Sequence, residues 1–442
     1  MARSTFIISL LLIFQIFSQA QDTTQLPGKW SLQQCIEYAK QFNIQVNSLR
    51  LTEQTAEQEV LLAKAQKLPG IAGTASASLT NSKNANPVVG GFQTQASFAN
   101  NFLVSSSWVV YNGGYLNDVV KQNQLSVQTA NLNVSIQENS ITLQITQAYL
   151  NILLAKENIL YLQDLLKTSQ AQVDQSQQQY NAGSIAKVSL IEIQAQLAND
   201  KYNLVTAQST ERQNALTLKQ LLLLPSGTPF DIVVPDTLMA SSLTASLPEA
   251  QKQALRTRPE VKMSELGVQI SQLDLAKAKS GYYPVATVGA LLASGYSDNE
   301  NFSYLKQLDN NFYQEIGLTL SIPIFTKRVN KTNVENAKIE IAQSQLSLTN
   351  TKTLLSQEVE QAYINILNAQ AQYDASLEQL TSAKESYRIV SEELKVGAAN
   401  TVDYLTQKSL YFQALENYIQ AKYSTALNIR IYEFYMGEPV KL

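Results

Sequence analysis

The chain contains the heptapeptide Gln147–Leu153 (QAYLNIL) and returns to it, with one change, as Gln361–Leu367 (QAYINIL). The two copies are 214 positions apart, and the same offset carries Gly183 onto Gly397 without a gap. An internal repeat of this length is stronger evidence for the overall architecture than any local sequence pattern. The sequence therefore predicts two copies of one structural plan.

The duplication divides the chain into a first repeat at 21–225 and a second repeat at 247–442. The stretch from Pro225 to Ser246 contains three prolines. Proline cannot donate a backbone hydrogen bond, so it interrupts regular structure. We predict an irregular linker at 226–246 that forms a girdle at mid height of an elongated molecule.

Each repeat reads as helix, strand, strand, long helix, turn and return helix. The long segments 118–181 and 329–395 contain neither proline nor glycine. At about 1.5 Å per residue, each would form a helix approaching about 100 Å. The opening and return helices are about half as long: 31–68, 247–280, 188–224 and 402–435. These lengths predict that two short helices stack end to end beside one long helix.

Apolar residues recur along the long segments in alternating steps of four and three. The first series is Ile141, Ile145, Ala148, Ile152, Ala155, Ile159, Leu162 and Leu166. The second series is Leu355, Val359, Ala362, Ile366, Ala369, Tyr373, Ser376 and Leu380. This heptad spacing predicts coiled-coil packing.

Between the helices the apolar period changes to two, which indicates strands at about 70–82, 97–111, 283–296 and 312–325. One face of these strands would contact lipid through large apolar side chains: Phe98, Phe102, Trp108, Phe312, Ile316, Leu318 and Leu320. Aromatic residues also cluster at the strand ends, as in the girdles of membrane barrels. The alternative is a soluble four-stranded sheet packed on helices.

Closure of the sheet predicts the number of chains. Four strands cannot close a membrane barrel, which needs about eight, and an open edge in lipid leaves backbone groups unpaired at several kcal/mol each. Two chains would give about eight strands with a filled interior, and three would give about twelve with a channel. The polar inward faces favour three chains.

The N-terminal 1–20 has the pattern of a signal peptide. Arg3 precedes an apolar run at 6–17, and small residues at 18–20 suit a signal peptidase, which gives a mature start near Gln21. The alternative is a buried N-terminal helix. Cys35 lies well beyond the cleavage region, and we expect it to be a core thiol.

Composition excludes most catalytic chemistry. With no histidine and one cysteine in 442 residues, the chain lacks the groups for Ser-His-Asp or Cys-His catalysis, for His- or Cys-based metal sites and for an intrachain disulfide. Only carboxylate-based catalysis survives, and no carboxylate pair stands out. A net charge of −3 gives no basic face for nucleic acid. We expect no enzyme, no metal and no cofactor.

The duplicated plan and three short motifs resemble the TolC-like outer-membrane efflux family (outer membrane factors). The motifs are the strand exit 321–325 (SIPIF) and the turns 181–184 (NAGS) and 395–398 (KVGA). The resemblance implies a mainly α fold with a membrane β-barrel segment. It implies a homotrimer in the outer membrane of a diderm bacterium, with a twelve-stranded β-barrel continued by a twelve-helix coiled-coil α-barrel in the periplasm.

The resemblance also implies a function. Such ducts passively conduct substrates delivered by a proton-driven or ATP-driven inner-membrane pump through a periplasmic adaptor (membrane fusion) protein, and they open at the periplasmic helix tips. The residues expected to contact the adaptor are Gly183, Ser184, Ile185, Leu394, Gly397, Ala398 and Asn400. Simple helix capping by the two glycines is the plainer interpretation.

Family gate positions fall on Asp403, Thr406, Ser189 and Ala399. A threefold ring of Asp403 would attract cations, whereas the plainer interpretation is an acid favoured by a helix N-terminus. The other three positions depart from the family pattern, so we expect no arginine–aspartate lock. A closed state would depend on packing and neutral hydrogen bonds.

Two alternatives to efflux remain open from the sequence. The first is the outer-membrane duct of a type I protein secretion system. The second is a non-channel periplasmic coiled-coil structural protein, which the strand pairs disfavour.

Overall fold

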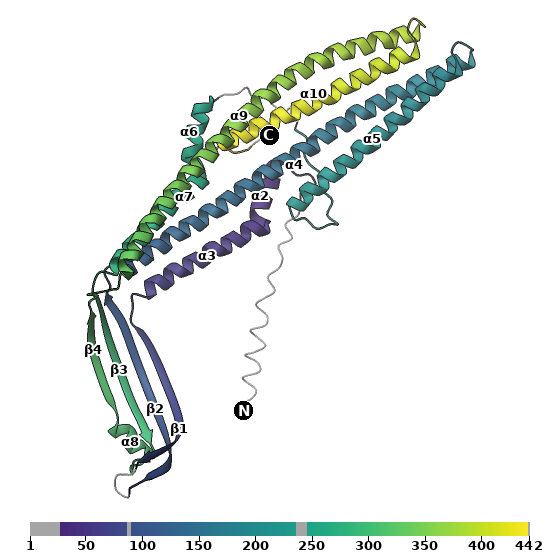
Figure 1. The fold of residues 1–442 in the computed structure, drawn as a ribbon. Helices are drawn as coiled ribbons and strands as arrows, with labels where there is room; N and C mark the ends of the chain where they lie inside the picture. The colour runs from purple at the N-terminus through teal and green to yellow at the C-terminus, as the bar shows by residue number, and fades with distance from the viewer. Residues whose placement is uncertain (1–26, 86–89, 236–244, 441–442) are drawn as a thin grey trace, which may run out of the picture.

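The computed structural model describes residues 27–85, 90–235 and 245–440. The predicted signal peptide at 1–20 lies outside the described residues, as does part of the predicted linker. The molecule is elongated, with a sheet at one end and long helices running from it to the far end (Figure 1).

The two repeats contain helices of equal length in the same order. In the first repeat these are α2 (Leu32–Phe42), α3 (Ile44–Ala65), α4 (Tyr115–Asn181) and α5 (Lys187–Leu221). In the second they are α6 (Leu247–Thr257), α7 (Pro259–Ser280), α9 (Val329–Lys395) and α10 (Thr401–Tyr435). Both sets have 11, 22, 67 and 35 residues. The fold is therefore a duplication at the level of whole helices.

The opening helices are broken, whereas the sequence predicted each as continuous. In the first repeat Asn43 ends α2 and caps α3, because its side chain accepts hydrogen bonds from Gln45 N at 2.9 Å and Val46 N at 3.1 Å. In the second repeat Pro259 removes a donor and forces Arg258 into an extended conformation, with ψ of 132°. The return helix predicted to reach 224 ends at Leu221.

The short helices stack along the long ones. α3 and α5 lie end to end along α4, and α7 and α10 lie end to end along α9 (Figure 1). Each chain thus presents helical columns of similar height. Within the described ranges, every helix falls short of the combination of length and hydrophobicity that crossing a bilayer demands.

The predicted heptad seams are largely buried. In α4 burial runs from Ile141 to Leu162 with Ile159 half-buried, and Leu165 then takes the buried place predicted for Leu166. Beyond this point the buried positions of α4 are polar: Ser169, Gln172 and Ser176. In α9 the buried seam positions are Leu355, Val359, Ala362, Ile366, Ala369 and Ser376.

The sheet contains four antiparallel strands in the order β1-β2-β3-β4. Their bounds are β1 (Gly70–Ala85), β2 (Phe92–Tyr111), β3 (Val285–Ser297) and β4 (Tyr313–Ser321). β4 ends before the predicted 325 because Pro323 has no N–H to donate. A helix that the sequence analysis missed, α8 (Tyr304–Asn310), follows β3, where the buried Gln307 accepts from Ser297 N at 2.8 Å.

At mid height the chain crosses between the columns in irregular segments. Trp30 is buried and pairs with Ile232 in an isolated parallel bridge. The Tyr149 hydroxyl, in the middle of α4, donates to Val233 O at 2.6 Å, and Lys156 forms an ion pair with Asp231 at 2.8 Å. These contacts fasten the described part of the linker to the first long helix.

Cys35 provides a test of the core. Its side chain is fully buried, and burial raises the pKa of the thiol to about 12. We expect the folded protein to resist a disulfide reagent at about pH 8, where an ordinary thiol reacts, and to react after unfolding in guanidinium chloride. Release of one thiol equivalent from the folded protein would contradict this packing.

Candidate functional site: the helix tips, the hairpin junction and the sheet face

Two turns of the same design lie at the end of the molecule farthest from the sheet (Figure 1). After α4, Gly183 has φ of 75°. Its N–H donates to Tyr180 O at 2.9 Å, and Ser184 N donates to Gln179 O at 2.8 Å. This pair of bonds is the Schellman arrangement, which satisfies the last carbonyls of a helix.

The turn after α9 repeats this arrangement. Gly397 has φ of 78° and donates to Leu394 O at 3.2 Å, and Ala398 N donates to Glu393 O at 2.8 Å. A Cβ atom at either glycine would meet open space. The glycines are therefore needed for the left-handed backbone and not for close packing.

The structure places all the predicted adaptor-contact residues in or beside these two turns. Ile185 and Leu394 are half-buried, and the others are exposed: Gly183, Ser184, Gly397, Ala398 and Asn400. Their exposure makes the two turns available to a partner. Contact with an adaptor stays a prediction.

The predicted gate residues lie near the tips, and the capping bond of Asp403 and the side-chain bond of Thr406 are to other residues of their own helix end. Asp403 is exposed in the first turn of α10, and its N–H is capped by Asn400 Oδ1 at 2.8 Å. Thr406 bonds its own helix at Val402 O, at 2.8 Å. Ser189 lies in the first turn of α5, and Ala399 lies in the turn between α9 and α10. Across the described ranges, Asp403 forms no ion pair within the chain.

A buried ion pair that the sequence analysis missed joins the two helical hairpins. Lys408 on α10 donates to Asp200 Oδ2 on α5 at 2.6 Å and to Ser169 Oγ on α4 at 2.7 Å. Gln196 donates to the second oxygen of Asp200 at 2.8 Å. Lys408 and Asp200 are 2% and 1% exposed. Both repeats are thus held together at one shielded point.

Burial is the main influence on the pKa of Lys408. It lowers the pKa of Lys408 from its ordinary value, while the bond to Asp200 opposes that shift. Neither partner could leave the other without exposing an uncompensated charge to a low-dielectric interior. The sequence does contain a signal for the pair, because each residue takes an apolar-stripe position: Asp200 follows Leu197, and Lys408 follows Tyr404 at helical spacing.

A tyrosine cluster lies beside the ion pair. The rings of Tyr387 and Tyr411 stack with centroids 5.4 Å apart, and Tyr387 Oη lies 3.3 Å from Tyr404 Oη. The cluster borders a groove of about 750 Å³ between α4, α9 and α10. Side chains from both hairpins line it, including Tyr161, Asp164, Lys384 and Arg388.

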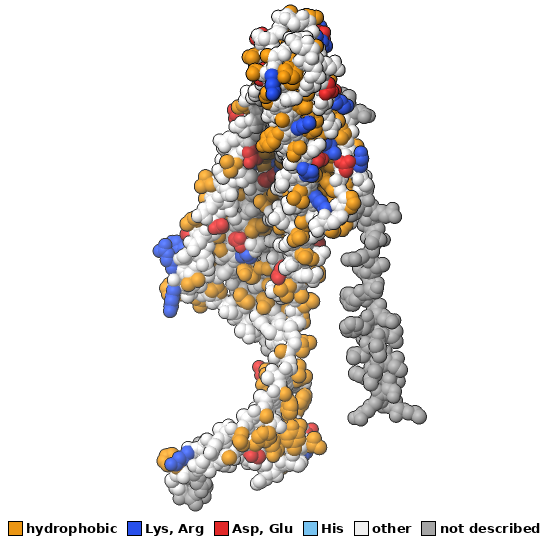
Figure 2. All heavy atoms as spheres, turned by 90° about the vertical axis from the view of Figure 1, so that its right-hand side faces the viewer, with side chains coloured by type: hydrophobic (Ala, Val, Ile, Leu, Met, Phe, Trp, Pro, Cys, Tyr) orange, Lys and Arg blue, Asp and Glu red, His pale blue; other side chains and the backbone are white. Residues whose placement is uncertain are grey.

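The strand register gives the sheet one apolar face. Phe102 pairs with Ser294, Trp108 with Val288, and Leu318 with Val288 on the other side. The same register places the predicted lipid-facing residues of β2 and β4 on one face: Phe98, Phe102, Trp108, Ile316, Leu318 and Leu320. Phe312 lies just before β4. Figure 2 shows apolar side chains gathered over the sheet.

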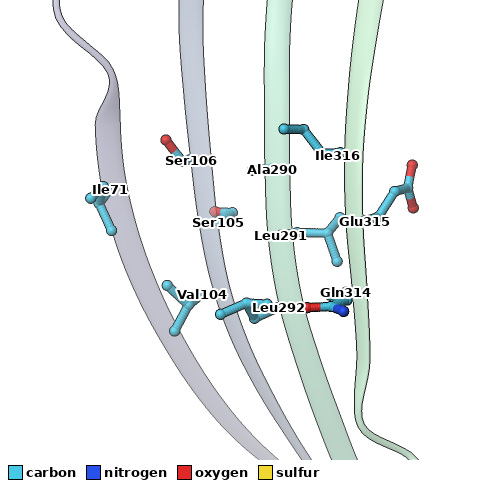
Figure 3. Close-up of a pocket in the computed structure, with 10 residues that line it drawn as sticks. All are labelled: Ile71, Val104, Ser105, Ser106, Ala290, Leu291, Leu292, Gln314, Glu315 and Ile316. Atoms are coloured by element: carbon cyan, nitrogen blue, oxygen red, sulfur yellow. The ribbon is translucent and has the colours of Figure 1, made fainter.

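The apolar face contains a shallow hollow of about 590 Å³. Figure 3 shows that every strand contributes to it, through Ile71, Val104, Leu292 and Ile316 among others. Its lining also includes the polar residues Ser105, Ser106, Gln314 and Glu315. Across the described ranges, no group of acidic residues or cysteine could hold a metal ion.

Comparisons with known proteins agree on one family. The sequence model of a family described as outer membrane efflux protein matches residues 35–222 and 250–430. Outer membrane protein TolC of Escherichia coli is 23% identical over 302 residues, which are 66% of this chain and 60% of that protein. The chain thus spans less than two thirds of that relative in the alignment.

Two further matches extend over more of the chain. The protease secretion protein PrtF of Dickeya chrysanthemi is 19% identical over 408 residues, covering 88% of this chain and 84% of that one. Among solved structures, CusC, whose description refers to transmembrane channel formation, superposes with a TM-score of 0.79 at 18% identity over 92% of both chains. This likeness establishes the fold.

The buried ion pair yields a stability prediction. Lys408→Met would leave Asp200 buried without a cation, and we expect it to lower the free energy of unfolding by about 3–5 kcal/mol. Combining it with Asp200→Leu removes both charges and should restore most of that loss. Thermal denaturation followed by circular dichroism measures both.

Lys338→Met is the matched control. It breaks an exposed ion pair with Glu335 on α9 at 2.9 Å and should leave the denaturation midpoint almost unchanged, because water screens exposed pairs. Equal denaturation midpoints for Lys408→Met and Lys338→Met would show that the buried pair does not stabilise the hairpin junction.

Proposed function

The chain belongs to the outer membrane efflux protein family, and we propose that three copies form the exit duct of a tripartite efflux system. Membership confirms the predicted resemblance and places the chain among channels of the outer membrane. The observation that carries the proposal is the direct join between an amphipathic four-stranded sheet and helices about 100 Å long. A sheet of this kind suits a bilayer, and helices of that length suit a periplasmic tunnel.

The open sheet edges support a trimer. β1 and β4 each pair with one neighbour in the chain, so closing the sheet requires strands from other copies. Three copies supply about twelve strands, which leaves room for an aqueous lumen. The stacked helices form four columns per chain, so the same three copies would supply twelve columns for the tunnel.

The second face of the sheet supports a water-filled lumen. The register that gathers the apolar residues on one face puts small polar residues on the other: Thr74, Ser76, Ser78, Ser105, Ser107, Thr287 and Thr319. Hydroxyl-bearing side chains form hydrogen bonds with water, and these residues are too small to fill the interior of a barrel. Passive conduction needs such a wall and no catalytic group.

The tips support docking of a periplasmic adaptor that links the duct to an inner-membrane pump. Both turns expose backbone and small side chains at the end opposite the sheet. Opening would act on the segment beyond the buried ion pair, because Lys408 fastens α10 to the first hairpin eleven positions after Gly397. In this proposal Asp403 from three copies lines the constriction.

The proposal is tested by incorporating the purified protein into planar bilayers. We expect discrete conductance steps and a trimer that dissociates on heating in detergent. A protein that stays in the soluble periplasmic fraction and forms no pores would instead support the non-channel structural alternative.

Protein secretion is the second candidate, because one relative is a protease secretion protein. The same duct would then receive an unfolded polypeptide from a transport ATPase. Deleting the gene separates the two functions: drug sensitivity with unchanged protein export indicates efflux, and loss of one exported protein indicates secretion.

Asp403 tests the constriction. Asp403→Ala removes one negative charge per copy from the tip, and we expect cation selectivity in planar bilayers to fall because fewer fixed charges attract cations. Asp298→Ala, which removes a carboxylate beyond the far end of β3, is the control. If the reversal potential is unchanged in both variants, Asp403 does not line the conduction path.

Gly397 tests the adaptor contact. Gly397→Leu puts a branched side chain at φ of 78° in the middle of the proposed contact, so we expect pump-dependent resistance to be lost while trimers persist in the membrane. Gly267→Ala, in the interior of α7 where a Cβ atom meets open space, should keep full resistance. Resistance that survives Gly397→Leu would place the adaptor elsewhere.

A further inference from the structure

Two consecutive cationic residues lie between β4 and α9, and both have a backbone conformation that is unfavourable for residues other than glycine. Lys327 and Arg328 have φ of 46° and 68°, in the left-handed region where a Cβ atom crowds the backbone. At the equivalent place in the first repeat, 214 positions earlier, the chain has Gly113 and Gly114, with φ of 67° and 87°. The second repeat thus keeps two charged side chains where its own first repeat uses glycine.

Protruding apolar residues lie just before these cations, separated from them by Thr326. Ile324 is 94% exposed and Phe325 is 83% exposed. The alternation that puts Leu318 and Leu320 on the apolar face of β4 continues beyond the strand to Ile322 and Ile324. The apolar face of the sheet therefore ends in an exposed apolar segment, and two cations follow after one threonine, Thr326.

More cations surround the boundary between sheet and helices. We call the following exposed residues the junction cations: Lys64, Lys67, Lys279, Lys327, Arg328 and Lys331. In the described part of the chain none of them forms an ion pair. Figure 2 shows lysine and arginine side chains gathered where the helices approach the sheet.

The acids at this boundary are already occupied. Asp118 pairs with Lys121 at 3.0 Å, Asp274 with Lys277 at 2.7 Å, and Glu335 with Lys338 at 2.9 Å. The nearest acid on α3, Glu59, lies five positions before Lys64. Arg328 and Lys331 also lie near enough to Glu335 to help Lys338 lower the pKa of its carboxyl. The boundary nevertheless has more cations than acids, and they lie beside apolar side chains.

We propose that the junction cations bind the phosphate groups of anionic phospholipids in the periplasmic leaflet of the outer membrane. Apolar side chains with cations beside them match the acyl chains and charged headgroups of a lipid surface. This inference rests on the proposed channel, because it needs the sheet in the bilayer and the helices on the periplasmic side.

A second copy of the chain fits these cations less well. Closing the sheet brings the β4 edge of one copy to the β1 edge of the next. Lys327 and Arg328 of one copy would then approach Lys64 and Lys67 of the next copy, and these like charges would repel one another. Phosphate groups between the copies would relieve that repulsion, which favours lipid as the occupant.

The double variant Lys327→Gly/Arg328→Gly tests the proposal on full-length trimers. Glycine suits both φ values, so the turn should fold as its first-repeat counterpart does. Proteins are incorporated into phosphatidylcholine bilayers containing spin-labelled phosphatidylglycerol, and electron spin resonance measures its enrichment around the protein. We expect enrichment of about fivefold or more for the wild type, decreasing with salt, and a fall toward onefold for the variant.

Lys187→Ala/Lys201→Ala removes two exposed cations from α5, far from the sheet, and should keep the enrichment. Three results would overturn the proposal: an unchanged preference in the glycine variant, an equal loss in the α5 control, or loss of the trimer in the glycine variant, which would assign the pair to a contact between copies. Spin-labelled lipopolysaccharide enriched in place of phosphatidylglycerol would also overturn it, by assigning the cations to the outer leaflet. Conductance measured on the same samples tests the proposed channel independently of lipid binding.

Discussion

The unpaired backbone at the two edges of the sheet is the constraint on which the rest of the structure depends. Among the residues that the structure describes, β1 and β4 each leave one row of N–H and C=O groups without a strand partner. In hydrocarbon each such group costs several kcal/mol, and a strand of nine residues such as β4 accumulates more than the 5–15 kcal/mol that typically stabilises a whole domain. The number of copies that closes the sheet then also determines how many helical columns meet at the other end. In the proposed trimer, one requirement of the bilayer would thus determine the width of a tunnel that lies outside it.

The parts of the fold that depend on local pattern could be predicted from the sequence. Absence of proline and glycine identified both long helices, and the heptad positions from Ile141 to Leu162 are largely buried as expected. The breaks at Asn43 and Arg258 were missed because one capping side chain or one proline outweighs a continuous apolar period. The outer ends of β1 and β2 were missed because residues such as Lys83 and Thr94 do not alternate in polarity and are held by pairing with each other.

The candidate site could be predicted only where one residue determines the conformation. Gly183 and Gly397 identify the tips because left-handed backbone favours glycine. The pair of Asp200 and Lys408 was missed because its members are far apart in sequence and a charge in an apolar stripe does not reveal its partner. The roles assigned to Asp403 and the tip residues stay predictions, since they depend on neighbouring copies and partners. The polar seam at Ser169 also departs from an apolar coiled coil, and the hydroxyl of Ser169 accepts a hydrogen bond from Lys408 there.

The equal lengths of the two repeats make their turns nearly interchangeable in shape, yet their charges differ. In a trimer the tip would present six turns with almost the same backbone, alternating between the first and second repeat. The first turn is followed by Lys187, and the second by Asp403. A partner that recognises only backbone shape would meet a sixfold surface, whereas one that recognises charge would meet a threefold surface. The duplication thus lets one rim distinguish partners by symmetry, according to which property they recognise.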